Sequence, residues 1–246
     1  MRALSGQQIV DAWGRGLDRA PLDRALMLLS AAEPEPAQSD FSRLSIGERD
    51  GLLLALRRMT FGTTLPAYAK CRECDAILRF ELDIEELERQ QSPTAGSGPM
   101  VLTADGFEVE FRLPTARDLE AVSRYGSADA YGLLLERCVI EARRGEAPVA
   151  ARQLPESVLA ALSERMESED PLADIPINLA CDLCGHKWSP ILDIGSCLWA
   201  EVEASAERIM YEVASLANLY GWSESEILAM GPARRKRYLE LARRRG

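Results

Sequence analysis

The spacing of hydrophobic positions predicts a mainly helical chain. Apolar residues three and four positions apart, with capping residues at their starts, predict helices that open at Ser5 and run over 21–32, 45–61, 115–124, 128–143 and 155–167. A longer helix is expected to open at Ser196, with an apolar stripe at 198, 202, 206, 209, 213, 216 and 220. Trp199 and Tyr211 fall outside this stripe, so they are expected to leave apolar surface for another chain. Short helices over 223–230 and 232–245 close the chain.

Strict alternation of apolar and polar residues predicts the strands. Leu78 to Ile84 alternates as a strand with one buried face, and 101–113 predicts a hairpin around Asp105-Gly106. Further strands are expected at 175–179 and 188–194. The segments 33–42 and 90–99 have the composition of loops, and no internal repeat of useful length is evident.

Composition fits a soluble globular protein of one or two domains. The chain has 246 residues, with 47% hydrophobic and 28% charged residues. No run approaches the roughly 18 apolar residues that a membrane span needs, and the N-terminus does not resemble a secretory signal. We therefore expect a cytoplasmic protein without a membrane partner.

Charge is unevenly distributed along the chain. The net charge is −10, yet residues 232–246 hold seven basic residues and one acid. The acidic remainder is repelled by phosphate backbones and disfavours nucleic acid as the main ligand. The basic end suits either a solvated helix terminus or contact with an acidic surface.

Four of the six cysteines form two CxxC pairs, Cys71/Cys74 and Cys181/Cys184. A thioredoxin-like redox pair opens a helix in a βαβ unit, whereas both pairs here adjoin alternating strands. A disulfide scaffold is typical of small secreted domains. The third interpretation is one tetrahedral zinc site, since two CxxC turns on hairpins present four thiolates to one metal.

The zinc interpretation makes Cys71, Cys74, Cys181 and Cys184 the ligands of one structural zinc ion per chain. Zinc-ribbon pairs usually lie about 15–20 residues apart. Here 106 residues lie between Cys74 and Cys181, so the intervening segment must pack as a unit of its own. Cys138 and Cys197 stand alone in predicted helices.

Catalysis is not indicated. Four thiolates leave no open metal position for water or substrate. His186 is the only histidine, is expected to point away from the metal into solvent, and no nucleophile or nucleotide-binding motif accompanies it. The sequence thus predicts neither an enzyme nor a small-molecule substrate.

These elements define the expected architecture. The fold class is α+β, mainly helical, with a small zinc-ribbon-like antiparallel β module and an inserted helical and hairpin region. The expected segments are 1–43 (helices and linker), 44–89 (helix, first zinc knuckle and strand), 90–170 (insertion), 171–195 (second knuckle) and 196–246 (C-terminal helices with the basic tail).

Several segments, in their order, resemble proteins of phage-tail-like contractile injection loci. The stretches that carry the resemblance are Leu44–Arg58, Thr60–Gly62, Cys71–Cys74, Phe111–Asp118, Cys181–His186, Tyr220–Leu228 and Arg234–Tyr238. The family resembles the baseplate hub assembly chaperones of contractile-tailed phages, in a zinc-bearing bacterial branch. This resemblance implies the four paired cysteines as metal ligands, and baseplate or hub proteins as partners.

Two functions therefore stand before the structure is considered. The first is a non-catalytic structural or assembly protein of a phage-tail-like contractile particle. The alternative is a zinc-ribbon adaptor in nucleic-acid transactions, which the cysteines and the basic tail favour and the acidic body disfavours.

Overall fold

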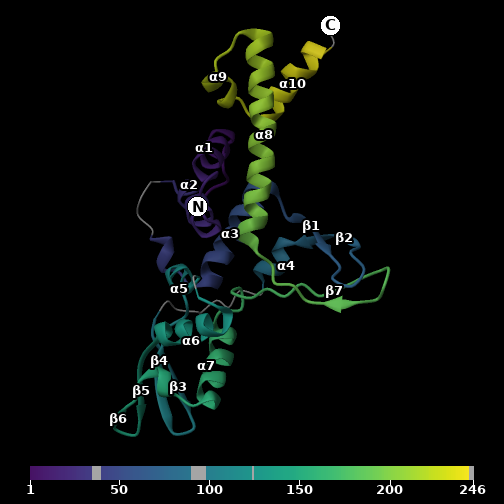
Figure 1. Cartoon of the computed structure of the whole chain (residues 1–246). Coiled ribbons are helices and arrows are strands. Elements are labelled where there is room, and N and C mark those ends of the chain that lie inside the picture. The colour runs from purple at the N-terminus through teal and green to yellow at the C-terminus, as the bar shows by residue number, and fades with distance from the viewer. Residues whose placement is uncertain (35–39, 90–97, 124, 244–246) are drawn as a thin grey trace. The chain divides into compact units, whose positions relative to one another are not determined.

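The computed structural model describes residues 1–34, 40–89, 98–123 and 125–243 (Figure 1). The chain divides into two compact units, one of Met1–Gln38 with Asp193–Gly246 and one of Ser39–Leu192. Helices dominate and the sheets are small and antiparallel, so the predicted α+β class is confirmed. Of the predicted loops 33–42 and 90–99, residues 35–39 and 90–97 lie outside the described residues, and Phe41 and Ser42 belong to a short 3-10 helix.

The first unit is helical. Its elements are α1 (Gly6–Gly16), α2 (Pro21–Ala31), α8 (Ile194–Tyr220), α9 (Glu224–Leu228) and α10 (Pro232–Arg243). The long helix α8 packs against α1, α2 and α10. It begins at Ile194, two residues before the predicted start, because the Asp193 carboxylate accepts the backbone N–H of Ser196 at 2.9 Å.

Trp199 on α8 corrects a sequence expectation, because its side chain is only 6% exposed. The indole lies against Gly16 of α1, so closely that a Cβ added at Gly16 would come within 2.3 Å of the ring. The Arg24 guanidinium covers the ring at 4.5 Å from its centroid, and its Nε donates to the Gly16 carbonyl at 2.8 Å. Trp199 is therefore a core residue of this unit, whereas Tyr211 is exposed as expected.

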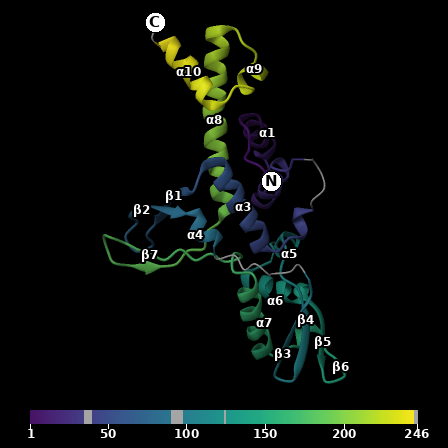
Figure 2. The ribbon, with the colours of Figure 1, turned by 180° about the vertical axis from the view of Figure 1, so that it is seen from behind.

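The second unit begins with the short 3-10 helix η1 (Phe41–Arg43) and α3 (Ile46–Phe61), which opens on the predicted capping box of Ser45 and Glu48. Two hairpins then frame the cysteine pairs. They are formed by β1 (Thr64–Lys70) with β2 (Ile77–Asp83), which leads into α4 (Ile84–Glu88), and by β7 (Leu179–Ala180) with β8 (Lys187–Trp188). The β1–β2 hairpin and β7 lie side by side in both views (Figure 1 and Figure 2).

The structure contains one strand, β1, that was not expected, and its second hairpin is shorter than expected. No strand was expected before Cys71. β1 is an edge strand of a two-stranded sheet, where the missing N–H of Pro66 is tolerated. In the second hairpin, Pro190 has no N–H to donate back to Ile177, so it interrupts the ladder. Regular pairing is confined to two residues on each strand, with an isolated bridge between Pro176 and Ile191.

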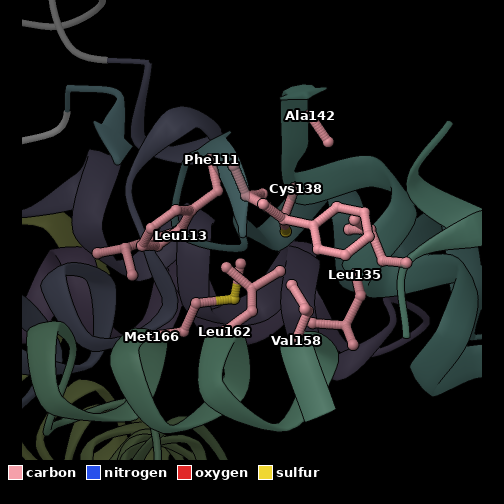
Figure 3. Close-up of a cluster of buried hydrophobic side chains, with 11 residues drawn as sticks. Phe111, Leu113, Leu135, Cys138, Ala142, Val158, Leu162 and Met166 are labelled. Carbon is pink, nitrogen blue, oxygen red and sulfur yellow. The ribbon is translucent and has the colours of Figure 1, made fainter. Parts of the chain in front are cut away.

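The insertion between the hairpins has its own sheet and core. Its elements are β3 (Met100–Ala104), β4 (Phe107–Phe111), α5 (Ala116–Val122), α6 (Ser127–Cys138), β5 (Val139–Arg144), β6 (Ala147–Pro148), η2 (Ala151–Gln153) and α7 (Glu156–Glu169). The strand order is β3-β4-β5-β6. Phe111 of β4 and Leu135 of α6 face Val158, Leu162 and Met166 of α7 across an apolar core (Figure 3).

One helix of the insertion was predicted too long. The helix expected over 128–143 ends at Cys138, and Val139–Arg144 forms β5 instead. β5 completes the hydrogen bonding of β4 and places Ala142 in the core. Pairing with a neighbouring strand overrides the helical pattern here, and the β-branched Val139 and Ile140 favour the extended chain.

Asp118 at the start of α5 is a buried electrostatic centre of the insertion. Its side chain is 1% exposed, and it pairs with Arg112 at 2.6 Å and with Arg137 at 3.0 Å. Thr115 donates to it from both its backbone N–H and its hydroxyl. Burial opposes ionisation, but the hydrogen bonds from Arg112 and Thr115 prevail and hold the pKa of Asp118 well below its usual range.

Candidate metal centre

The two CxxC turns meet at one point of the second unit. The four sulfur atoms of Cys71, Cys74, Cys181 and Cys184 all lie within 4.8 Å of one another. The Sγ atoms of Cys71 and Cys184 are 3.6 Å apart, and those of Cys74 and Cys181 are 3.5 Å apart. The first cysteine of each turn thus faces the second cysteine of the other.

Each turn is built in the same way. The backbone N–H of Cys71 donates to the Ala76 carbonyl at 2.8 Å, and the N–H of Cys181 donates to the His186 carbonyl at 2.8 Å. The residue after each second cysteine has a left-handed backbone, with φ of 58° at Asp75 and 74° at Gly185. These bonds close each turn tightly enough to aim both of its thiols at the same side.

The thiols perturb one another. A hydrogen bond from the backbone N–H of Cys184 outweighs burial and lowers the pKa of Cys181 to about 7. A backbone hydrogen bond from Ala76 likewise favours the thiolate of Cys74, but the neighbouring thiols of Cys184 and Cys181 prevail and raise its pKa to about 12. Four sulfurs this close cannot all ionise unless a cation compensates their charge.

The cluster fits a tetrahedral divalent metal. With a zinc–sulfur bond of about 2.3 Å, the sulfurs of a regular tetrahedron lie about 3.8 Å apart. The two shortest contacts are close to that edge. Cys71 and Cys181 are buried while Cys74 and Cys184 are exposed, so a metal here would be anchored on the core and reached from one side.

The knuckles belong to an internal repeat with a constant offset of 110 residues, which corrects the expectation of no repeat. The matching residues are Pro66, Cys71, Cys74, Leu82, Asp83 and Ile84 in the first copy and Pro176, Cys181, Cys184, Leu192, Asp193 and Ile194 in the second. The helix before each hairpin keeps the offset, since α3 begins at Ile46 and α7 at Glu156. Burial also alternates identically over 65–84 and 175–194.

A buried aspartate joins the two copies. Asp170, at the end of α7, accepts the hydroxyl of Ser45 and the backbone N–H of Gly47 at the start of α3, both at 3.0 Å. A Cβ at Gly47 would lie 2.1 Å from an Asp170 oxygen, so only glycine allows this approach. Burial raises the pKa of Asp170 despite these hydrogen bonds. The copies are thus tied at their helices as well as at their cysteines.

The remaining candidate residues do not belong to the four-sulfur cluster of the described residues. Cys138 is buried in the insertion core, where burial raises its pKa to about 12, and Cys197 lies on α8 of the other unit. His186 was expected to point into solvent, but it is half-buried and stacks on Trp188 with centroids 5.5 Å apart. No helix among the described residues is long and apolar enough to cross a membrane.

Comparison with known proteins bears on the larger part of the chain. A family model described as T4 bacteriophage base plate protein matches residues 30–199. The matched region includes both cysteine turns and the whole insertion. Searches of curated proteins and of solved structures found no match.

Proposed function

The chain belongs to the T4 bacteriophage base plate protein family, and from this premise we propose that it is a non-catalytic structural or assembly protein of a phage-tail-like contractile particle. The family match carries this proposal. Within it, the chain binds baseplate or hub proteins, either as an assembly chaperone or as a component of the finished particle.

The cysteine cluster supports a structural zinc ion in this role. Cys71, Cys74, Cys181 and Cys184 would be its ligands, two from each copy of the repeat. Bound zinc supplies a cross-link between the two hairpins, and four thiolates leave no coordination position for a substrate. Fixing the hairpins and α3 as one rigid body would present constant surfaces to the neighbouring baseplate proteins.

The proposed role is tested in the particle itself. An affinity tag on this chain, followed by purification of the assembly and mass spectrometry, should recover baseplate or hub proteins. Purification at an early and a late stage of assembly separates a chaperone, which is lost, from a retained component. Recovery of nucleic acid with a steep salt dependence, and of no tail protein, would instead support the adaptor function.

The metal is tested separately on the purified chain. Elemental analysis should give one zinc per chain, and the Cys138→Ala/Cys197→Ala double variant should retain it. Four thiolates also accept iron, which would show as visible absorption and would replace zinc in this proposal. Metal-free protein with four reactive thiols, although correctly folded, would contradict a structural metal site.

A further inference from the structure

The β1–β2 hairpin has two edges, and its hydrogen-bond pattern identifies which backbone groups face outward. The flanking bonds join Cys71 to Ala76 and Ile84 to Thr63. In an antiparallel ladder, bonded pairs recur at every second residue. The register therefore directs the backbone groups of Leu78, Phe80 and Leu82 toward β1, and those of Ile77, Arg79 and Glu81 away from it.

The two edges differ in whether every outward residue has a backbone N–H. On β1 the outward positions include Pro66, which has no N–H and prevents an added strand from pairing there. On β2 every outward residue keeps its N–H, and none of these groups has another backbone hydrogen-bond partner among the described residues. β2 therefore presents a seven-residue edge that is open to pairing.

The second copy of the repeat serves as an internal comparison. Pro190 occupies the position of Phe80 and lacks the N–H that this position uses toward its partner strand. β8 is consequently two residues long. At the outward position where the first hairpin has Ile77, 66% exposed, the second has Lys187. A knuckle hairpin thus does not require a long edge or an exposed isoleucine in order to fold.

We propose that the free edge of β2 pairs with β2 of a second copy of this chain, antiparallel about a two-fold axis at Phe80. This register places Arg79 opposite Glu81 of the other copy, and Glu81 opposite its Arg79. Neither side chain has an ion-pair partner within the described part of the chain. A register centred on Arg79 would instead place Arg79 opposite Arg79 of the other copy and Glu81 opposite its Ile77, so no ion pair would form between these residues.

The same register continues the apolar face. Leu78, Phe80 and Leu82 are half-buried on the other side of β2. About the two-fold axis, Phe80 meets Phe80, and Leu78 meets Leu82 of the other copy. Strand pairing then satisfies the open backbone groups, and each chain extends the other's two-stranded sheet to four strands. This self-association does not depend on the baseplate role, since it follows from the hairpin alone.

Charge-reversal substitutions at Arg79 and Glu81 test the proposal in the full-length, metal-loaded protein. The dissociation constant of the dimer is measured by sedimentation velocity over a concentration series. The natural chain should dimerise. Arg79→Glu and Glu81→Arg should each raise the dissociation constant of the dimer by about 10-fold or more, because each creates two cross-strand pairs of like charge. An equimolar mixture of the two variants should form a heterodimer, since every cross-strand pair then regains opposite charges.

The double variant Arg79→Glu/Glu81→Arg restores opposite charges across the strands, so its dimer dissociation constant should lie within about 3-fold of that of the natural chain. Lys187→Glu, a charge reversal on the second hairpin, should leave the dimer dissociation constant unchanged. Circular dichroism and metal content monitor the fold of each variant. A natural chain that stays monomeric at its highest soluble concentration, or a dimer indifferent to both single reversals, would overturn the pairing. Loss of a baseplate partner from Arg79→Glu while the natural chain is monomeric would assign the edge to that partner instead.

Discussion

The Sγ of Cys74 lies 3.5 Å from the Sγ of Cys181, although 106 residues separate them in the chain. The whole insertion, with its own sheet and core, begins and ends between these two residues. A metal bound at this point would close that loop and join the two copies of the repeat. Its loss should therefore act first on the hairpins, and only then on the helices.

Removing one thiol tests this order. Cys181→Ser should lower the midpoint of thermal unfolding markedly and abolish stoichiometric zinc, because three thiolates hold the metal more weakly. Zinc-finger peptides gain about 10–16 kcal/mol of apparent binding free energy from such sites. Most helical circular dichroism should persist, since the helices of the first unit lie outside the cluster. Cys197→Ala is the matched control, and equal melting of both variants would mean that Cys181 is not structural.

Gly16→Ala should destabilise the first unit. A Cβ at this position would lie 2.3 Å from the Trp199 ring and 2.9 Å from Met27, so the core must shift. Overpacking of this kind costs about 1–3 kcal/mol in unfolding free energy, which outweighs the gain of about 0.5–1 kcal/mol from replacing a helical glycine.

Gly14→Ala on the same helix is the control. Nothing lies within 4 Å of its Cβ, so this variant should be neutral or slightly stabilising in urea unfolding. If both variants behave alike, the close contact between Gly16 and Trp199 does not hold the helices together.

Asp118→Asn should lower the unfolding free energy by about 3 kcal/mol at neutral pH, because it removes the charge that pairs with Arg112 and Arg137. The pKa of Asp118 is depressed in the folded chain, so its contribution is complete above the unfolded value of about 3.9. The contribution of ionised Asp118 to the free energy of unfolding should therefore decrease as the pH falls below about 4.

The difference between the natural chain and Asp118→Asn should accordingly narrow in urea titrations at low pH. Glu120→Gln, on the exposed side of the same helix, should show no such dependence. A difference that is constant from neutral to acidic pH would mean that asparagine disturbs packing rather than charge.

The C-terminal helix is expected to contribute to partner binding through its cations. Arg235 is buried and pairs with Glu212 of α8 at 2.8 Å, so it anchors α10 within the unit. Lys236 and Arg237 are exposed. Lys236→Ala/Arg237→Ala should therefore leave stability within about 0.5 kcal/mol of the natural chain and reduce recovery of an acidic baseplate partner.

This double variant is more selective than deletion of residues 232–246, which would also remove the Arg235 anchor. Arg15→Ala/Arg19→Ala removes the same charge from exposed positions near the C-terminal end of α1 and is the control. Equal partner recovery with both double variants would place the docking surface elsewhere.

Local patterns in the sequence determined much of this molecule. The capping boxes at Ser5, Ser45 and Ser223 start helices where they were expected. The Asp105-Gly106 turn forms its hairpin with φ of 52° and 77°. These features succeed because each depends on hydrogen bonds and sterics within a few residues. The meeting of the two CxxC turns was also expected from local chemistry, since two thiols three residues apart beside a strand suit one shared metal.

Only the tertiary structure decided the features that depend on distant partners. β1 forms a strand because it pairs with β2, although it contains Pro66. β5 forms a strand because it pairs with β4, although its sequence has a helical pattern. Trp199 is buried because Gly16, remote in sequence, leaves room for its ring. The repeat escaped notice because few residues of its two copies are identical, and the likeness shows only once both hairpins and their burial are compared. Contacts between residues far apart in the chain cannot be inferred from a local pattern. At these positions their free energy outweighs the local propensity for helix or strand.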